Sequence, residues 1–342
     1  MPNSETIRLV IDGQDLSGWT GATIDMSIAT IADAFSLSAP FDPADSKIRS
    51  LLRPFAYQEI MLYIGDEPLL TGILESVEGT IESGERTLTI QGRSKTGQIV
   101  DCSIDGPLEH SGLTLAAIAR QVCRPFGVTV RADTDSPAIE HARAEYGETV
   151  ASYLGRLAAV RNILLGSSFK GELILASAVA LKSAPVRASL VEGTAPVLSV
   201  RASFDSTSRF SRYRAATQFA GEPDIIGTVT DPAIKLTRPR LALVPDSDID
   251  PNQTAARLRA EANVKAITAT VTVAGWKRPD GERWSERQAV TLKAPSAMLP
   301  TETAWIISSA SYKLDASGQS VTLDLVLPET YAGENPKATP WA

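Results

Sequence analysis

The chain has 342 residues, of which 43% are hydrophobic and 21% charged, a composition typical of globular proteins rather than of disordered, fibrous or membrane chains. This length exceeds one domain of roughly 100–200 residues and predicts two or three compact units. The formal charge of -7 falls entirely in the first hundred residues, which hold 14 acids and 7 bases, whereas the remainder holds 26 of each. Because nucleic-acid-binding proteins usually present a basic face to the phosphates, this distribution disfavours that class.

The sequence carries no recognisable targeting segment. Its start lacks the basic residues and the apolar stretch of a signal peptide, and no run approaches the ~20 apolar residues of a membrane span. Two cysteines, Cys102 and Cys123, are too few for a disulfide framework in so long a chain. We therefore expect a protein without membrane insertion that folds in a reducing cytoplasm, with both cysteines as buried small side chains.

The first hundred residues alternate between apolar and polar positions. Alternating runs occupy residues 7–11, 24–28, 35–37, 60–64, 70–74 and 87–90. Turn pairs such as Asp12-Gly13 and Ser83-Gly84 separate them. Short strands at this spacing, without a long helix, predict a small antiparallel barrel or sandwich over residues 1–100.

The next segment has a helical period. Ser111 is a candidate N-cap for a helix with Leu115, Ile118, Ala119 and Val122 on one face. A second helix is expected from about Glu148, followed by strands at 163–165 and 173–175. These elements predict a small α+β domain over residues 101–190.

The strand signal returns after residue 190. Strands are expected at 197–204, 213–219, 268–276, 288–292, 305–314 and 321–327. An insertion at about 222–267 interrupts them and carries one helix, for which Asp250 is the natural N-cap and Pro251 the first helical residue. Residues 191–342 are therefore expected to form a second β domain.

Two hairpins in the two β-rich segments resemble each other. Residues 83–90 and 317–325 both place a Ser-Gly pair before an alternating strand. The similarity is compatible with a duplicated domain and also with the generic likeness of hairpins, and both interpretations stay open.

Residues for enzymatic or cofactor chemistry are not arranged in a known pattern. Cys102, His110, Cys123 and His141 lack the short chelating pair of structural zinc sites, so we expect no metal, with buried cysteines and surface histidines. Phosphate-binding glycine loops and a nucleophile elbow are absent from the sequence, which predicts no cofactor. Carboxylate pairs such as Glu75 with Glu78 could serve glycoside cleavage, but such acids are usually solvated. The pattern favours a structural or assembly protein that is not an enzyme.

One stretch resembles a known family. Residues 275–284, in which Gly275-Trp276 ends a strand and Trp284 follows a turn containing Gly281, look like the signature of Mu-type phage baseplate hub proteins. Further segments agree in order and spacing: residues 35–37, 112–127, 148–173, 211–213 and 238–239.

The resemblance implies a fold and a role. The fold is mainly β with α+β: two tail-tube-like antiparallel β-barrels, a small α+β domain and a helical insertion. Such hubs are homotrimers at the centre of a contractile-tail baseplate, and their six barrels form a pseudo-sixfold ring. The implied partners are the hexameric tail tube protein and the trimeric central spike protein, with baseplate wedge and tape-measure proteins as further candidates. DNA passes through without specific binding, and the protein resides in the virion after assembly in the host cytoplasm.

The resemblance also implies a function for the net negative charge of residues 1–100. Negative side chains in a DNA-conducting channel would repel the polyanion and keep it from sticking. The candidate channel-facing acids are Asp25, Asp33, Glu75, Glu78 and Glu82; the alternative is that they are ordinary solvent-facing strand positions.

Two other functions compete with the hub. One is a tail-associated cell-wall hydrolase acting through a carboxylate pair. The other is a carbohydrate- or receptor-binding tail protein that exposes Trp276 and Trp284 for sugar stacking. We expect these tryptophans to pack inside the second barrel instead.

Overall fold

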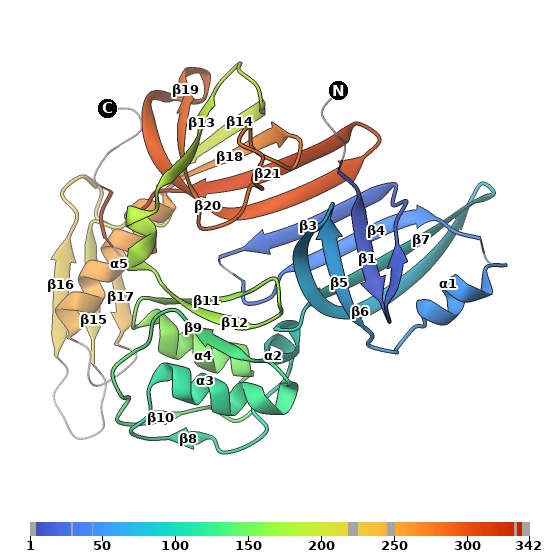
Figure 1. Cartoon of the computed structure of the whole chain (residues 1–342). Helices are drawn as coiled ribbons and strands as arrows, with labels where there is room; N and C mark the ends of the chain where they lie inside the picture. Colours follow the sequence, from blue (N-terminus) through green and yellow to red (C-terminus); the bar gives the residue numbers. More distant parts are fainter. Residues whose placement is uncertain are drawn as a thin grey trace. The chain divides into compact units, whose positions relative to one another are not determined.

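The N-terminal part of the chain forms an antiparallel sheet (Figure 1). The computed structural model describes residues 5–28, 30–42, 44–217, 225–244, 250–331 and 334–336. The first strands lie in the order β3-β4-β7-β6-β5-β1-β2. Their bounds, with that of one short helix, are β1 (Ile7–Ile11), β2 (Gln14–Leu16), β3 (Gly21–Ser27), β4 (Ala34–Pro40), α1 (Ser46–Leu51), β5 (Glu59–Ile64), β6 (Glu67–Glu82) and β7 (Glu85–Ser94).

Alternation along these strands produces the N-terminal core. On β1 the odd-numbered residues Ile7, Leu9 and Ile11 are buried, whereas the even-numbered ones are partly exposed. Close packing leaves no room for a side chain at Gly92, where a Cβ would lie 2.1 Å from the Ile73 carbonyl oxygen. The strands predicted for residues 1–100 are therefore present.

The α+β segment follows directly. Its elements are α2 (Gly97–Asp101), β8 (Glu109–His110), α3 (Leu115–Cys123), the 3-10 turn η1 (Arg124–Phe126), β9 (Val130–Ala132), β10 (Ala142–Arg143), α4 (Val150–Ala159), β11 (Ile163–Ser167) and β12 (Leu173–Ser177). The predicted apolar faces of α3 and α4 form one buried core with β11 and β12. Thr114, not Ser111, caps α3, because its Oγ1 accepts a hydrogen bond from the Ala117 amide at 3.3 Å.

A second set of strands follows η2 (Val179–Ser183). It comprises β13 (Val186–Val191), β14 (Val197–Phe204), β18 (Ile267–Ala274), β19 (Ala289–Ala294), η3 (Pro295–Ala297), β20 (Leu299–Asp315) and β21 (Gly318–Val326). The neighbours run β14-β18-β21-β20, and β19 pairs with β20 and with β13. Because β13 pairs with β19, residues 186–190 belong to this set and not to the α+β domain where the prediction placed them.

The two sets repeat one strand order. In the first set β3, β4, β7 and β6 are successive neighbours, and in the second β14, β18, β21 and β20 are. When the four strands of each set are numbered in chain order, both sets have the spatial order first, second, fourth, third. In each set a further strand, β5 or β19, pairs antiparallel with the third of these strands, β6 or β20. The sets differ in that β1 pairs antiparallel with β5, whereas β13 pairs parallel with β19. This shared topology favours the duplication that the hairpins left open.

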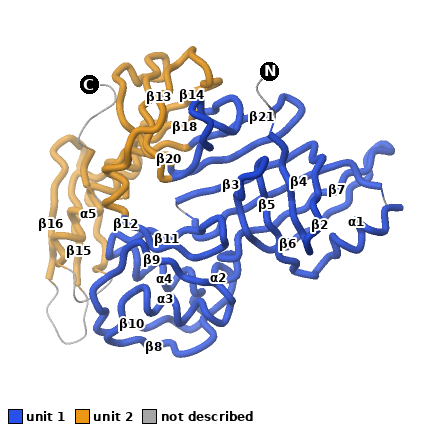
Figure 2. The backbone as a smooth tube through the Cα atoms, viewed as in Figure 1, with its two compact units in different colours: residues 1–177, 272–286, 308–323 blue, residues 178–271, 287–307, 324–342 orange. Residues whose placement is uncertain are grey.

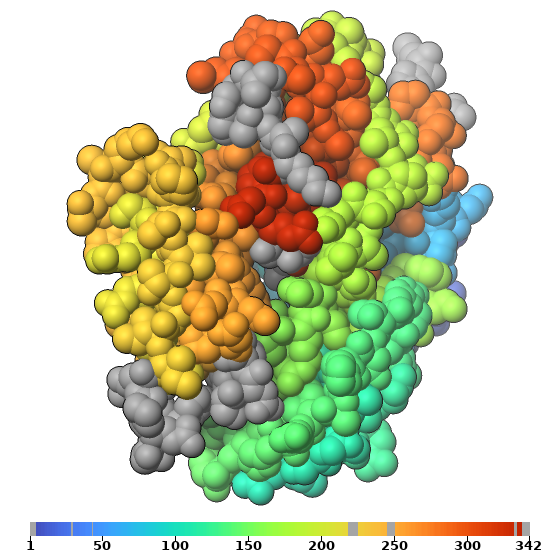
Figure 3. Space-filling model, turned by 90° about the vertical axis from the view of Figure 1, so that its left-hand side faces the viewer, coloured from blue at the N-terminus to red at the C-terminus, as the bar shows by residue number. Residues whose placement is uncertain are grey.

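The insertion in the second set is larger than predicted. Its strands β15 (Arg212–Ala216), β16 (Ile226–Thr230) and β17 (Pro239–Leu243) form a separate sheet against α5 (Pro251–Lys265), drawn in yellow and orange in Figure 3. The strand predicted at 213–219 therefore belongs to the insertion, which contributes three strands besides the helix. Asp250 caps α5 as expected, since its Oδ1 accepts from the Asn252 amide at 2.9 Å. Residues 222–224 of the predicted insertion lie outside the described residues, as do 245–249.

The chain divides into two compact units, coloured separately in Figure 2. Unit 1 comprises residues 1–177, 272–286 and 308–323, and unit 2 comprises residues 178–271, 287–307 and 324–342. Within unit 1, residues 309–314 of β20 pair antiparallel with β3. Among the described residues no helix has the length and apolar character needed to span a bilayer.

Candidate functional site

One face of the unit 1 sheet is lined by small polar side chains. The register places Ser309, Ser311 and Lys313 of β20 beside Ser27, Asp25 and Thr23 of β3. It continues to Ser36 and Ser38 of β4 and to Gln91 and Thr89 of β7. Side chains at directly paired positions point to the same side of a sheet. We call these residues the hydroxyl face; its members are Thr23, Asp25, Ser27, Ser36, Ser38, Ser76, Glu78, Thr80, Glu82, Glu85, Thr87, Thr89, Gln91, Ser309, Ser311 and Lys313.

The opposite side of the same strands is apolar. Ile24, Leu37 and Ile90 are fully buried, as are Ala310 and Tyr312 on β20. The alternation therefore gives the sheet a core side and a polar side, and it holds the hydroxyls and carboxylates away from the core. The sequence analysis used this alternation for strands but missed the hydroxyls as a surface; serine and threonine at every second position were the available signal.

Three of the five predicted acids lie on the hydroxyl face. Asp25 on β3 is exposed, and Glu78 and Glu82 are exposed near the end of the long β6–β7 hairpin. Their negative charges are thus presented from the polar side, as expected for acids that would face a channel. Whether that side faces a channel stays a prediction.

The other two acids hold the structure together. Asp33 is only 5% exposed, and its backbone amide donates to Ser94 Oγ at 3.1 Å while its carbonyl accepts from the Ser94 amide at 2.9 Å. The expectation of an outward-facing Asp33 therefore does not match its burial. Glu75 lies where the β6–β7 register shifts, and both its oxygens bond the Arg93 guanidinium at 2.8 Å.

Arg93 is neutralised from two sides. Its Nη1 also donates to Asp101 Oδ1 at 3.1 Å, at the end of α2. The hydrogen bonds that Arg93 donates to Asp101 and Glu75 raise the pKa of its guanidinium, and the contact with Arg93 lowers the pKa of the Asp101 carboxyl. The register places Arg93 on the same side of the sheet as Asp25, and there its positive charge, which would otherwise attract phosphate, is bound by two carboxylates.

The Gly-Trp hairpin is a packed structural element. Gly275 and Gly281 have φ of +75° and +88°, conformations that favour glycine. Trp276 and Trp284 are buried, and Trp276 Nε1 donates to the Lys313 carbonyl oxygen at 3.1 Å. Tyr312 Oη donates to the Trp284 carbonyl. The hypothesis of a sugar-binding surface built on these two tryptophans is therefore wrong, because Trp276 is only 2% exposed and Trp284 is fully buried.

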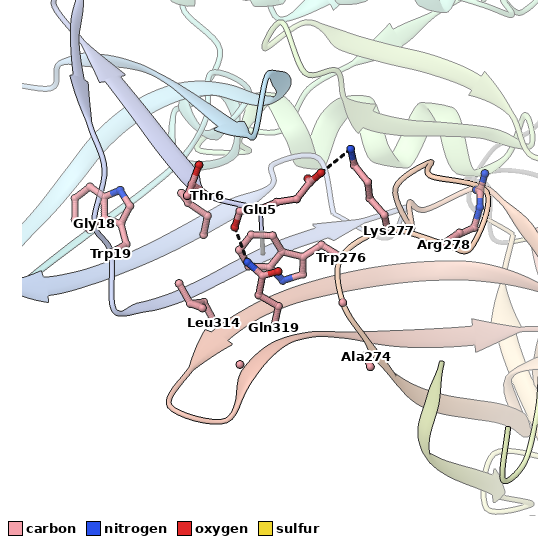
Figure 4. Close-up of a pocket in the computed structure, with 13 residues that line it drawn as sticks. Glu5, Thr6, Gly18, Trp19, Ala274, Trp276, Lys277, Arg278, Leu314 and Gln319 are labelled. Atoms are coloured by element: carbon pink, nitrogen blue, oxygen red, sulfur yellow. Dashed lines mark hydrogen bonds and ion pairs between the residues drawn. The ribbon is translucent and has the colours of Figure 1, made fainter. Parts of the chain in front are cut away.

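A cavity of about 660 Å³ borders this hairpin (Figure 4). Trp19, Trp276 and Leu314 line it, and Lys277 reaches across its rim to Glu5 at 2.7 Å and to Glu67 at 3.1 Å. These two carboxylates raise the pKa of the Lys277 ammonium. Lys277 thus links the hairpin to Glu5, which precedes β1, and to Glu67 at the start of β6.

The candidate metal ligands are likewise structural or dispersed. Across the part of the chain that the structure describes, no group of three or more histidine, cysteine or acidic side chains is placed to hold an ion. His110, expected on the surface, is buried and its Nδ1 lies 2.9 Å from Tyr153 Oη. Burial lowers the pKa of His110 and raises the pKa of the Cys123 thiol to about 12. Cys123 is buried as predicted, whereas Cys102 is half-buried.

Two family models match the chain. Residues 6–94 match the N-terminal domain of Mu phage baseplate assembly protein GpP-like proteins, and residues 96–177 match the second domain of baseplate hub protein gp44-like proteins. Baseplate hub protein gp44 of Escherichia phage Mu is 29% identical over 349 residues, which cover 96% of this chain and 89% of that protein.

Solved structures agree with the family models. The 43 kDa tail protein of prophage MuSo2 from Shewanella oneidensis superposes with a TM-score of 0.82 at 28% identity, covering 96% of this chain and 100% of that one. A tail protein from Neisseria meningitidis MC58 shares the fold, with a TM-score of 0.83 at 22% identity over 97% of this chain and 99% of that one.

These matches identify the chain as a structural component of a phage tail. It is a Mu-type baseplate hub protein, and the family predicted from residues 275–284 and their companion segments is confirmed. The mainly β fold with few helices agrees with that family.

Proposed function

We propose that the chain forms a homotrimeric ring at the centre of a contractile-tail baseplate, with its two strand sets acting as two tail-tube-like barrels. Three chains would supply six similar sets, which match a hexameric tail tube on one side and a trimeric central spike on the other. The observation that carries the proposal is the repeated strand order, β3-β4-β7-β6 and β14-β18-β21-β20. A chain with a single set could not present sixfold symmetry as a trimer.

The hydroxyl face is the proposed lining of the channel. Its hydroxyl groups interact with water without net charge. Its acids, Asp25, Glu78, Glu82 and Glu85, outweigh the charge of Lys313, so its members together carry net negative charge. Such a wall would repel DNA phosphates and let the polymer slide, because a tight grip needs clustered Lys and Arg. DNA would thus pass without specific binding.

The domain assignment follows from the same proposal. Residues 1–100 would form the first barrel, the segment after it the α+β domain, and residues from about 186 onward the second barrel with its insertion. Tail tube and central spike proteins are the proposed direct partners, and wedge and tape-measure proteins are further ones. Assembly would take place in the host cytoplasm before incorporation into the virion.

The role proposed here is not enzymatic. Arg93 and Lys277, whose pKa values are raised, form ion pairs with Asp101 and Glu5 that neutralise their charge. A glycoside hydrolase acting through a carboxylate pair would need one carboxyl held protonated near a second, ionised one. Release of peptidoglycan fragments by the purified protein would contradict the proposal.

The test is the mass of the purified protein in solution together with electron-microscopic imaging. The expected result is a ring with a central hole and a mass about three times the 36.4 kDa of the chain. A monomer at every concentration, or a trimer without a hole, would refute the ring.

A further inference from the structure

The insertion contains a small sheet with one uncovered side. Its strands lie in the order β16-β15-β17, with β15 antiparallel to β16 and parallel to β17 (Figure 1). The helix α5 packs against one side, where Tyr213 and Ala215 share a buried core with Ala255. On that side a Cβ at Gly227 would lie 2.2 Å from the Pro251 carbonyl carbon, so helix and sheet are in direct contact.

The register defines the opposite side of this sheet. Side chains alternate along a strand, so Arg212, Arg214 and Ala216 point away from the side on which Tyr213 and Ala215 are buried. Directly paired residues of neighbouring strands share a side. We call this side the insertion face; its members are Arg212, Arg214, Ala216, Ile226, Thr228, Thr230, Pro239, Leu241 and Leu243.

Three large apolar side chains of the insertion face are open to solvent. Leu243 is 62% exposed, Leu241 61% and Ile226 45%. Leu241 and Leu243 follow each other on this side of β17, and Ala216 joins Leu243 to Ile226 across the sheet. The three side chains thus form one group rather than scattered single residues. A contiguous exposed apolar group is typical of an interaction site, whereas single exposed apolar residues are ordinary.

The insertion face is also basic. Arg212 and Arg214 lie on the central strand beside the apolar group, and none of the nine members is acidic. Neither guanidinium has a carboxylate partner among the described residues, unlike Arg209, whose Nη2 lies 3.2 Å from Asp231 Oδ2. The face therefore combines two available positive charges with exposed aliphatic surface, and arginine is enriched at such protein interfaces.

The spacing of the two arginines indicates the kind of partner. Alternate residues of one strand lie about 7 Å apart. Acidic residues at positions i and i+4 of a helix share one face, with Cβ atoms about 5–6 Å apart, and a guanidinium binds a carboxylate through two parallel hydrogen bonds. An acidic amphipathic helix can therefore place carboxylates over Arg212 and Arg214 and an apolar stripe over Leu241 and Leu243. Single-stranded nucleic acid fits less well, because the face has no aromatic ring on which bases could stack.

We propose that the insertion face is the docking site of an acidic amphipathic helix from another protein of the tail. The carboxylates of that helix pair with Arg212 and Arg214, and its apolar side chains cover Ile226, Leu241 and Leu243. The inference goes beyond the proposed ring, which is built from the two strand sets and makes no use of the insertion.

A synthetic helix tests the chemistry of this face. The probe is a fluorescein-labelled peptide of 15 residues composed of Leu, Ala and Glu, with the leucines on one side of the helix. Its matched control carries Lys in place of every Glu. In fluorescence anisotropy with the full-length protein, the acidic peptide should bind at least tenfold more tightly than the basic one. Equal affinities would overturn the charge complementarity on which the proposal rests.

Substitutions on the insertion face locate the binding. Arg212→Glu combined with Arg214→Glu should weaken binding of the acidic peptide tenfold or more, because two attractive pairs become repulsive. Leu241→Ser combined with Leu243→Ser should weaken it by a similar factor, because less apolar surface is removed from water. Unchanged affinity in both variants would show that the peptide binds elsewhere and would refute the docking site.

A control of equal charge separates this face from general electrostatics. Arg120→Glu combined with Arg124→Glu makes the same charge change at exposed positions of the α+β segment and should leave the affinity within about twofold of the wild-type value. An equal loss in this control would overturn the proposal. The substituted side chains lie outside the buried cores, so all variants should keep the wild-type thermal melting temperature.

Photo-cross-linking during tail assembly tests the natural occupant. With p-benzoylphenylalanine in place of Leu243, the protein should cross-link to a segment that combines acidic residues with an apolar helical stripe, and Arg212→Glu with Arg214→Glu should lower the yield at least tenfold. The same probe in place of the exposed Thr207 should not give this product. Cross-links to DNA, to a second copy of this chain or to a segment without acids would overturn the proposal. Any of these results leaves the ring untouched, because its own test is the mass and shape of the purified protein.

Discussion

A ring that repels DNA through its hydroxyl face should begin to hold DNA when the charge of that face is reversed. Asp25→Lys combined with Glu82→Lys changes the charge by +4 per chain. Asp25 and Glu82 are exposed members of the hydroxyl face, so the double variant should fold like the wild-type chain, because neither substitution removes a buried contact.

The size of the effect follows from the number of charges. Three chains would place six lysines on the channel wall, and each lysine that meets a phosphate releases condensed counterions. The slope of log K against log salt is about -0.9 per contact, so six contacts give a slope near -5 and a loss of roughly 10³-fold in affinity between 50 and 200 mM salt. The wild-type ring should show no measurable affinity over the same range.

The assay is fluorescence anisotropy of a short linear duplex titrated with the trimer at several salt concentrations. Glu140→Lys with Glu145→Lys is the matched control, because it makes the same charge change at exposed positions of the α+β segment. Equal DNA affinity in the two variants would refute the assignment of the hydroxyl face to the channel, since the effect would then depend on net charge alone.

Three further outcomes concern the fold itself. Trp284→Ala should lower the free energy of unfolding by about 3–5 kcal/mol, measured by urea denaturation, because the ring is fully buried; a loss below about 1 kcal/mol would mean the hairpin is not packed as described. A thiol reagent at pH 8 should modify Cys102 and spare Cys123, whose pKa is raised to about 12, until denaturant is added; two fast-reacting thiols in the native protein would contradict this. Burial lowers the pKa of His110, so the unfolded chain binds more protons and stability should fall as pH drops below about 6.5. His110→Gln should flatten that dependence in thermal melts, and an unchanged pH profile would assign it to other groups.

Local sequence patterns predicted many helices and strands correctly, because the interactions that form these elements join residues close together in the chain. Alternation in residues 7–11 reflects a strand with one buried side, and the Asp250-Pro251 pair caps and starts α5 through groups that are adjacent in the chain. Recognition of the family rested on the Gly-Trp hairpin, whose glycines are needed at positive φ. In these places neighbouring residues determine the structure.

The predictions that were wrong concern residues whose surroundings come from distant parts of the chain. Asp33 is buried because Ser94, some sixty residues later, provides its backbone partners, and no local pattern encodes that contact. His110 is buried by Tyr153 of α4 for the same kind of reason. Strand β15 has the alternation of a barrel strand, but β16 and β17 of the insertion pair with it. Side-chain exposure and strand partners thus depend on contacts between residues far apart in the chain, and the pattern within one segment does not predict such contacts.

The β20–β3 pairing also has a consequence for synthesis. Strand β3 is made among the first thirty residues, but the strand segment that covers its edge, residues 309–314, is made nearly three hundred residues later. At typical translation rates of about 5–20 residues per second, that edge stays uncovered for roughly 15–60 seconds on the ribosome. The N-terminal sheet therefore cannot be completed co-translationally from its own segment, and a prematurely terminated chain would carry an exposed β3 edge prone to aggregation. The first sheet can therefore be completed only after translation has passed residue 314.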